Sequence, residues 1–256
     1  LEKDGITIIF PNKQQIHIKI HLAMLSGDIP AIAKAINHTG HMSRYGCRLC
    51  KIRGDNGPFG GIYFPKDNFP APLQTLDEFL TGDPSFNINH SNSFTDLTLF
   101  SGPQFFGLEE LHLFGHGVAR TLWKIFKGEF GNTNRMRLAN NQISIISKSM
   151  KKSRAQIPTT FYGIEKDIEI HSGYFRGVDW LDFLIYIVPS LVLEFLSDDL
   201  DKRAIAHLVK GCSLALKWEI SKPEIEEMEK CFERWHNHLQ QLVNSNEMLI
   251  SVFRIT

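Results

Sequence analysis

The feature that most constrains the fold is a strand pattern that leads into the start of a helix near the beginning of the chain. Residues 16–22 alternate apolar and polar side chains, which is typical of a β-strand with one buried face. Pro30 suits the first turn of a helix, where a backbone N–H has no helical partner. Asp28 is therefore expected where a strand ends and a helix begins, an edge at which α/β proteins often place their chemistry.

The rest of the chain indicates an irregular connection followed by helices. Between Gly54 and Pro103 the sequence is rich in Gly, Pro, Asn, Asp, Ser and Phe, which predicts a long connection with short elements. Apolar residues then return at helical spacing, and Ser221 with Glu224 forms the capping box of a last helix. The expected helices cover 108–126, 180–195 (kinked or divided by Pro189), 204–218 and the segment after Ser221.

We therefore expect an α+β chain in three parts: a small α/β portion over 1–55, an irregular connection over 56–103 and a mostly α-helical portion over 104–256. Of the 256 residues, 43% are apolar, so the chain has the material for a core and global disorder is excluded. Its 28 Lys and Arg balance 28 Asp and Glu, which excludes a wholesale polycation but leaves room for a local basic surface.

The sequence predicts no membrane segment and no signal peptide. The longest uncharged apolar run, residues 183–193, is about half as long as a bilayer span requires. The first residue is Leu1, and residues 251–256 look like a strand cut in mid-course. We therefore expect the chain to be a piece of a longer protein.

Asp28 is a candidate ligand for a divalent cation. A carboxylate at the end of a strand is held in position by the sheet and is open to substrate, and hard divalent cations prefer oxygen ligands. The alternative is that Asp28 only caps the following helix, which is what most Asp residues before a helix do.

Cys47 and Cys50 form a CxxC pair, which places two thiolates on one turn, as in half of a tetrahedral zinc site. His38 and His41 lie just upstream and are candidates for the remaining ligands, which could equally come from sequence outside this chain. The alternative is a pair of buried thiols. A redox role is disfavoured, because no thioredoxin-like strand precedes the pair.

Two further groups of residues could carry chemistry. Glu109 and His112 are three residues apart, so on a helix they would face the same way, with His116 one turn further on. The alternative is a solvated helix end with a packing histidine. A basic stretch suits phosphate groups, although such stretches are often only a solvated face; it consists of Lys148, Lys151, Lys152 and Arg154.

The order of these segments is the most informative feature. Residues 27–31 followed by 40–50 resemble the D-x-P-A … G-C-x-x-C block of CACTA-type (En/Spm) DNA transposases, in the form common in fungal genomes. Residues 109–118 resemble the D-x-x-H element of the same family, with Glu109 where the family usually has Asp. Residues 177–184 and 208–215 also look like blocks of these transposases, so the resemblance covers essentially the whole chain.

The resemblance implies an RNase H-like catalytic core, of which residues 1–55 would be the second half, interrupted by a helical insertion domain. It implies two divalent ions, Mg²⁺ or Mn²⁺, held by an Asp-Asp-Glu triad in which Asp28 matches the second acid. Cys47 and Cys50 match half of a structural Zn²⁺ site whose two histidines precede the third acid. The implied partners are DNA at transposon ends and further copies of the protein, in the nucleus.

The same resemblance places the first triad acid before Leu1, and the two zinc-binding histidines and the glutamate after Thr256. We therefore expect the 256 residues alone to be inactive in DNA cleavage. The competing hypothesis is a non-catalytic, domesticated or decayed transposon module that binds DNA or protein and keeps a structural zinc half-site. A small-molecule enzyme has little support, because no Gly-rich phosphate loop, G-x-S-x-G elbow or dinucleotide fingerprint occurs.

Overall fold

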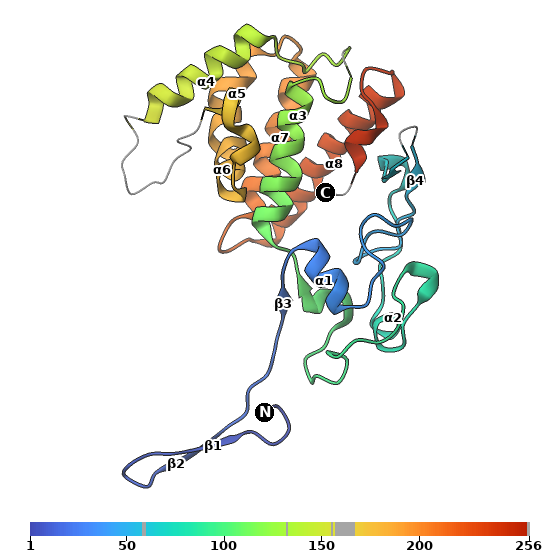
Figure 1. Ribbon diagram of the computed structural model, residues 1–256, viewed down its shortest axis with the longest axis vertical. Helices are drawn as coiled ribbons and strands as arrows, with labels where there is room; N and C mark the ends of the chain where they lie inside the picture. The colour runs from blue at the N-terminus through green and yellow to red at the C-terminus, as the bar shows by residue number, and fades with distance from the viewer. Residues whose placement is uncertain (58–59, 132, 155, 157–166, 255–256) are drawn as a thin grey trace. The chain divides into compact units, whose positions relative to one another are not determined.

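The computed structural model describes the chain except residues 58–59, 132, 155, 157–166 and 255–256, together with the side chain of Arg154. The chain forms two compact units (Figure 1). The N-terminal unit comprises residues 1–56 and 68–109, and the helical unit comprises 57–67 and 110–254. Helices and a few short strands make up a mixed α+β structure, which confirms the general fold class. Residues 68–103, expected as part of a connection, pack with the N-terminal unit.

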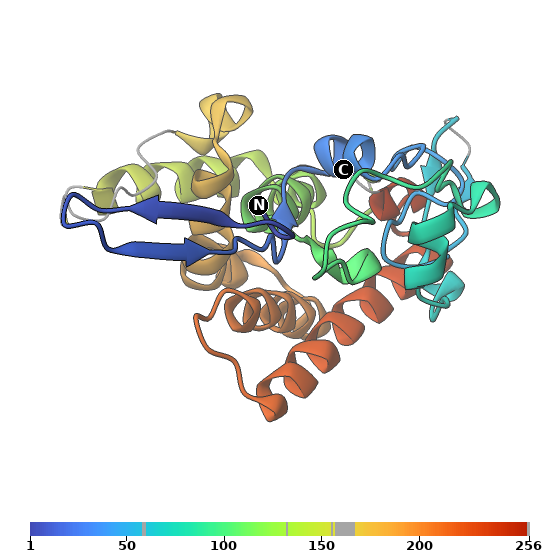
Figure 2. The same ribbon diagram turned by 90° about the horizontal axis from the view of Figure 1, so that it is seen from below.

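A β-hairpin opens the N-terminal unit (Figure 2). Strands β1 (Ile6–Ile9) and β2 (Gln15–Ile18) are antiparallel, with Ile6 opposite Ile18 and Ile8 opposite Ile16. The strand predicted over 16–22 therefore ends at Ile18. All residues of both strands are exposed, so the expected buried face is not covered.

A short parallel ladder follows the hairpin. Strand β3 (Leu25–Ser26) pairs in parallel with β6 (Phe106–Gly107), with Leu25 opposite Phe106 and Ser26 opposite Gly107. Helix α1 (Ile29–Ala35) begins directly after β3 and has Pro30 in its first turn, as predicted. The core beneath these elements is largely aromatic and aliphatic, and its fully buried residues are Ile32, Ile36, Phe79, Ile88, Phe105 and Phe106.

The segment between α1 and β6 is irregular, as its composition predicts. It contains helix α2 (Leu76–Thr81), which begins with a capping box of Thr75 and Glu78. Its other elements are short: β4 (Asp55–Asn56), β5 (Ile62–Tyr63) and the 3₁₀ helices η1 (Lys66–Asn68), η2 (Pro84–Phe86) and η3 (Gly102–Phe105).

The helical unit is built from helices of three kinds. Two are π-helical segments, η4 (Leu111–Ala119) and η6 (Phe183–Val192), and η6 contains Pro189. The α-helices are α3 (Arg120–Phe126), α4 (Asn140–Arg154), α5 (Ile168–His171), α6 (Gly177–Asp182), α7 (Asp199–Ala215) and α8 (Lys222–Asn244). Short 3₁₀ turns complete the unit: η5 (Ser172–Tyr174), η7 (Leu193–Phe195) and η8 (Ile250–Phe253).

The long helices follow the sequence patterns closely. Helix α8 begins with the predicted capping box, in which the Glu224 carboxylate accepts from the Ser221 N–H at 2.9 Å. Helix α7 begins five residues before the predicted start and packs along α8. Buried tryptophans on α3, α6 and α8 anchor the core of the unit: Trp123, Trp180 and Trp235. In the described part of the chain, no helix combines the length and apolarity that crossing a membrane requires.

The strand expected over 251–256 is a wrong prediction for the residues that the structure describes. Residues 250–253 form the 3₁₀ turn η8, in which the Val252 N–H bonds to the Leu249 carbonyl at 3.1 Å. Val252 and Phe253 are consecutive and both buried, which an alternating strand on a core surface would not allow.

Candidate functional site

Asp28 lies at the junction of β3 and α1 and is half-buried. Its Oδ1 accepts a hydrogen bond from the Ala31 N–H at 2.7 Å, so the carboxylate is the N-cap of α1. The capping role is confirmed. Metal binding by Asp28 stays a prediction, and it would have to use the carboxylate in the orientation that the cap fixes.

Glu109 occupies the equivalent place on the neighbouring strand. Asp28 follows the end of β3 by two residues, and Glu109 follows the end of β6 by two residues. Because Ser26 pairs with Gly107 in a parallel ladder, Asp28 and Glu109 follow the same end of the ladder, two residues beyond their strands. Glu109 lies one residue before the first helical residue, Glu110, and His112 lies on η4, so a joint role for Glu109 and His112 stays a prediction.

The Arg48 side chain is hydrogen-bonded to strand β6 of this ladder. Its Nη2 donates to the carbonyl oxygens of Phe106 at 3.2 Å and Gly107 at 2.8 Å, the two residues of β6. Arg48 lies between the two cysteines of the CxxC pair. The turn that carries the thiols is thereby tied to the strand that leads to Glu109.

The two thiols lie close together and are not oxidised to a disulfide. Cys47 Sγ accepts from the Leu49 N–H at 3.4 Å. A hydrogen bond from Cys50 lowers the pKa of the Cys47 thiol to about 6, with further help from backbone N–H groups and Arg48. Because the Cys50 thiol donates that hydrogen bond, its own pKa is raised. A low pKa on one thiol of a pair favours binding of a thiophilic metal, and zinc binding by this pair stays a prediction.

Neither upstream histidine completes that half-site. His38 is buried, its Nδ1 accepts from the Gly40 N–H at 2.9 Å, and burial lowers its pKa. His41 is half-buried. Across the described residues, no group of three or more His, Cys, Asp or Glu side chains is arranged to hold a metal ion. The described structure does not gather His38 or His41 with the two cysteines, so their part in a zinc site stays a prediction.

His112 and His116 both lie on η4, and their ring centroids are 5.6 Å apart. The spacing brings the rings together, as expected for residues four apart on a helix. Among the described residues, no His, Cys, Asp or Glu side chain joins them as a third metal ligand.

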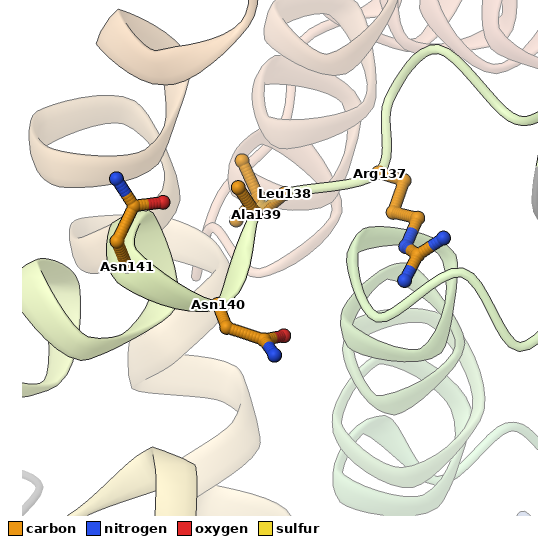
Figure 3. Close-up of a pocket in the computed structure, with 5 residues that line it drawn as sticks. All are labelled: Arg137, Leu138, Ala139, Asn140 and Asn141. Atoms are coloured by element: carbon orange, nitrogen blue, oxygen red, sulfur yellow. The ribbon is translucent and has the colours of Figure 1, made fainter.

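The basic stretch forms the second half of α4. Lys148, Lys151 and Lys152 are exposed, and Arg154 closes the helix, although its side chain lies outside the described residues. The opposite face of α4 is buried through Ile143, Ile146, Ser147 and Met150. Sequence reasoning missed an open hollow at the start of this helix, with a volume of about 480 Å³, which is lined by Arg137, Leu138, Ala139, Asn140 and Asn141 (Figure 3).

Comparisons with known proteins leave the family open. No protein-family model matches the chain, and no curated protein and no solved structure matches it. The resemblance to CACTA-type transposases therefore rests on the motifs alone.

Proposed function

We propose that this chain is part of a DDE-type DNA transposase of the CACTA kind, an enzyme that cleaves and joins DNA strands. The observation that carries the proposal is the parallel β3–β6 ladder, which sends Asp28 and Glu109 from one sheet edge. Carboxylates at the ends of adjacent parallel strands are a common way to gather acidic ligands in α/β folds. An RNase H-like core, with the helical unit as an insertion, is the finer fold that this proposal entails.

The residues at this edge have distinct roles in the proposal. Asp28 would hold a divalent ion, Mg²⁺ or Mn²⁺, and two such ions would activate the attacking oxygen and stabilise the leaving one at phosphorus. The bond from the Ala31 N–H to Oδ1 fixes the Asp28 carboxylate, which leaves Oδ2 as the oxygen for a cation. Arg48 keeps the end of β6, and with it Glu109, in register.

Replacing Asp28 with asparagine tests this role. Asparagine caps helices as well as aspartate does, so α1 keeps its cap while the negative charge is lost. In the full-length protein we expect Asp28→Asn to abolish strand cleavage and leave DNA binding nearly unchanged, as measured with a labelled DNA that carries the transposon end. The matched control is Asp83→Asn, which changes another capping aspartate of the same unit.

Cleavage that survives in Asp28→Asn removes Asp28 from the site. The 256-residue chain alone is expected to leave DNA intact, because its described residues do not gather three acidic ligands. Nicking by the isolated chain that depends on Asp28 would contradict this expectation. If the full-length protein binds DNA but never cleaves it, the non-catalytic module becomes the better description.

The thiol pair leads to a separate prediction. We expect the full-length protein to contain about one tightly bound zinc ion per chain, with Cys47 and Cys50 as two of its four ligands. The double variant Cys47→Ser/Cys50→Ser should lose this zinc, whereas Cys212→Ala, which removes a thiol buried on α7, should keep it. Metal analysis after gel filtration measures both. A folded wild-type protein without zinc would contradict the assignment.

A further inference from the structure

The segment around α4 differs in charge from the rest of this neutral chain. Between Glu129 and Glu165 the sequence contains no acidic residue, yet it contains six cations: Arg135, Arg137, Lys148, Lys151, Lys152 and Arg154. Arg135 is engaged by carboxylates, since its Nε lies 3.0 Å from Asp201 Oδ1. In the described structure, no acidic side chain forms an ion pair with the three lysines. The positive charge of α4 is therefore available to an external anion.

The exposed residues of α4 form a continuous stripe along the helix. Asn141, Ile145, Lys148 and Lys152 are exposed and follow one another at spacings of four, three and four residues, so they lie on one face. The acidic residues at the start of the neighbouring α5 are its N-cap, Asp167, and Glu169 in its first turn. The Asp167 carboxylate accepts a hydrogen bond from Ser147, which lies on the buried side of α4 and not on the stripe. The stripe is about 16 Å long, since eleven residues separate its ends.

The hollow extends this stripe beyond the start of the helix. In Figure 3 the Arg137 guanidinium and the Asn140 amide extend to the same side of the start of α4, and the Asn141 amide extends to the other side; all three residues line the hollow. All three side chains are exposed, and none of them forms a side-chain hydrogen bond to another described residue. The surface therefore carries a guanidinium and two amides at one end and ammonium groups at the other.

We propose that this face of α4 is a duplex-DNA-binding surface with a fixed polarity: Lys148, Lys151 and Lys152 bind backbone phosphates, and Arg137, Asn140 and Asn141 read base edges. The inference deepens the proposed function and rests on it. An α-helix fits the major groove, where Asn pairs with adenine and Arg with guanine through two hydrogen bonds each. Lysines contribute charge without reading sequence. The polarity therefore predicts that Arg137, Asn140 and Asn141 determine the preference for a DNA sequence. A lysine cluster alone would not predict this.

The first test concerns the phosphate contacts. Binding of the 256-residue chain to a labelled 20-bp duplex is followed by fluorescence anisotropy over a range of salt concentrations. The plot of log affinity against log salt has a negative slope. For Lys148→Gln/Lys152→Gln this slope should become less steep by about 2, since each lost phosphate contact removes about one unit. The control Lys222→Gln/Lys230→Gln removes two exposed lysines of α8 and should leave the slope unchanged.

The second test concerns the base contacts. A duplex is selected from a random pool for tight binding to the wild-type chain and compared with a scrambled duplex of equal composition. Asn140→Ala/Asn141→Ala should lose about 10- to 100-fold of the preference for the selected duplex, with the salt slope retained. Helix content measured by circular dichroism shows whether α4 is intact in each variant.

Four results would overturn the proposal: no duplex binding by the wild-type chain, a salt slope that does not respond to the α4 lysines, a selected preference that survives the asparagine variants, or tighter binding of single-stranded RNA than of duplex DNA. None of these measurements involves cleavage. The proposed function, tested by cleavage with Asp28→Asn, and the α4 proposal, tested by binding, can therefore be confirmed or contradicted separately.

Discussion

Gly115→Ala is expected to destabilise the helical unit by about 3 kcal/mol, the upper part of the range for overpacking a tight contact. Gly115 lies on η4, and a β-carbon added there would be 2.3 Å from the carbonyl oxygen of Gly177 and 3.0 Å from its carbonyl carbon. Gly177 opens α6, and a β-carbon on it would meet Leu111 of η4 at 2.9 Å. The two backbones therefore touch through a pair of glycines. Backbone atoms cannot rotate away as a flexible side chain can.

The intrinsic preference of helices acts in the opposite direction. Alanine favours a helix over glycine by about 1 kcal/mol, so a site with space would gain stability from the same change. Gly173 in η5 provides that comparison, because nothing lies within 4 Å of its added β-carbon and its φ lies outside the left-handed region. Urea unfolding followed by tryptophan fluorescence measures both variants. Equal stabilities for Gly115→Ala and Gly173→Ala would show that η4 and α6 do not meet at the glycine pair.

Local features of this fold could be read from the sequence because the interactions that cause them are local. The capping box at Ser221 and Glu224 and the Asp28 cap before Pro30 join residues at most three apart. The positions of Cys47 and Cys50 likewise follow from one turn of chain. Each of these could be predicted from spacing alone.

The features that give the candidate site its shape depend on distant residues. The β3–β6 ladder joins two strands of two residues each, about 80 residues apart, and neither has a recognisable pattern of its own. Without that ladder, the shared strand-end position of Asp28 and Glu109 and the carbonyl partners of Arg48 could not be foreseen. The hollow at Arg137, Asn140 and Asn141 did leave a signal, which is the acid-free segment between Glu129 and Glu165.

Asp201 on α7 is the second residue whose loss should have a large effect. Its side chain is fully buried, and its Oδ1 accepts from His238 Nε2 on α8 at 2.7 Å and from Arg135 Nε at 3.0 Å. This one carboxylate therefore joins α7, α8 and the segment that leads into α4. Asp198 and Glu247 lie further from Arg135, at 3.7 and 3.8 Å, and are poor substitutes.

Asp201→Ala is therefore expected to lower the free energy of unfolding by about 3–5 kcal/mol, because it leaves the buried His238 and the partly buried Arg135 without their shared acceptor. Asp199→Ala, on the same helix, removes an exposed carboxylate 3.6 Å from Lys202 and should cost less than about 1 kcal/mol. The double variant Asp201→Ala/His238→Ala should lose about 1–3 kcal/mol less free energy of unfolding than the two single variants together, since both changes remove the same contact. Urea unfolding of the four variants at neutral pH measures these differences. Additive losses would show that Asp201 and His238 stabilise the helical unit independently, and the carboxylate would then not be the joint between α7 and α8.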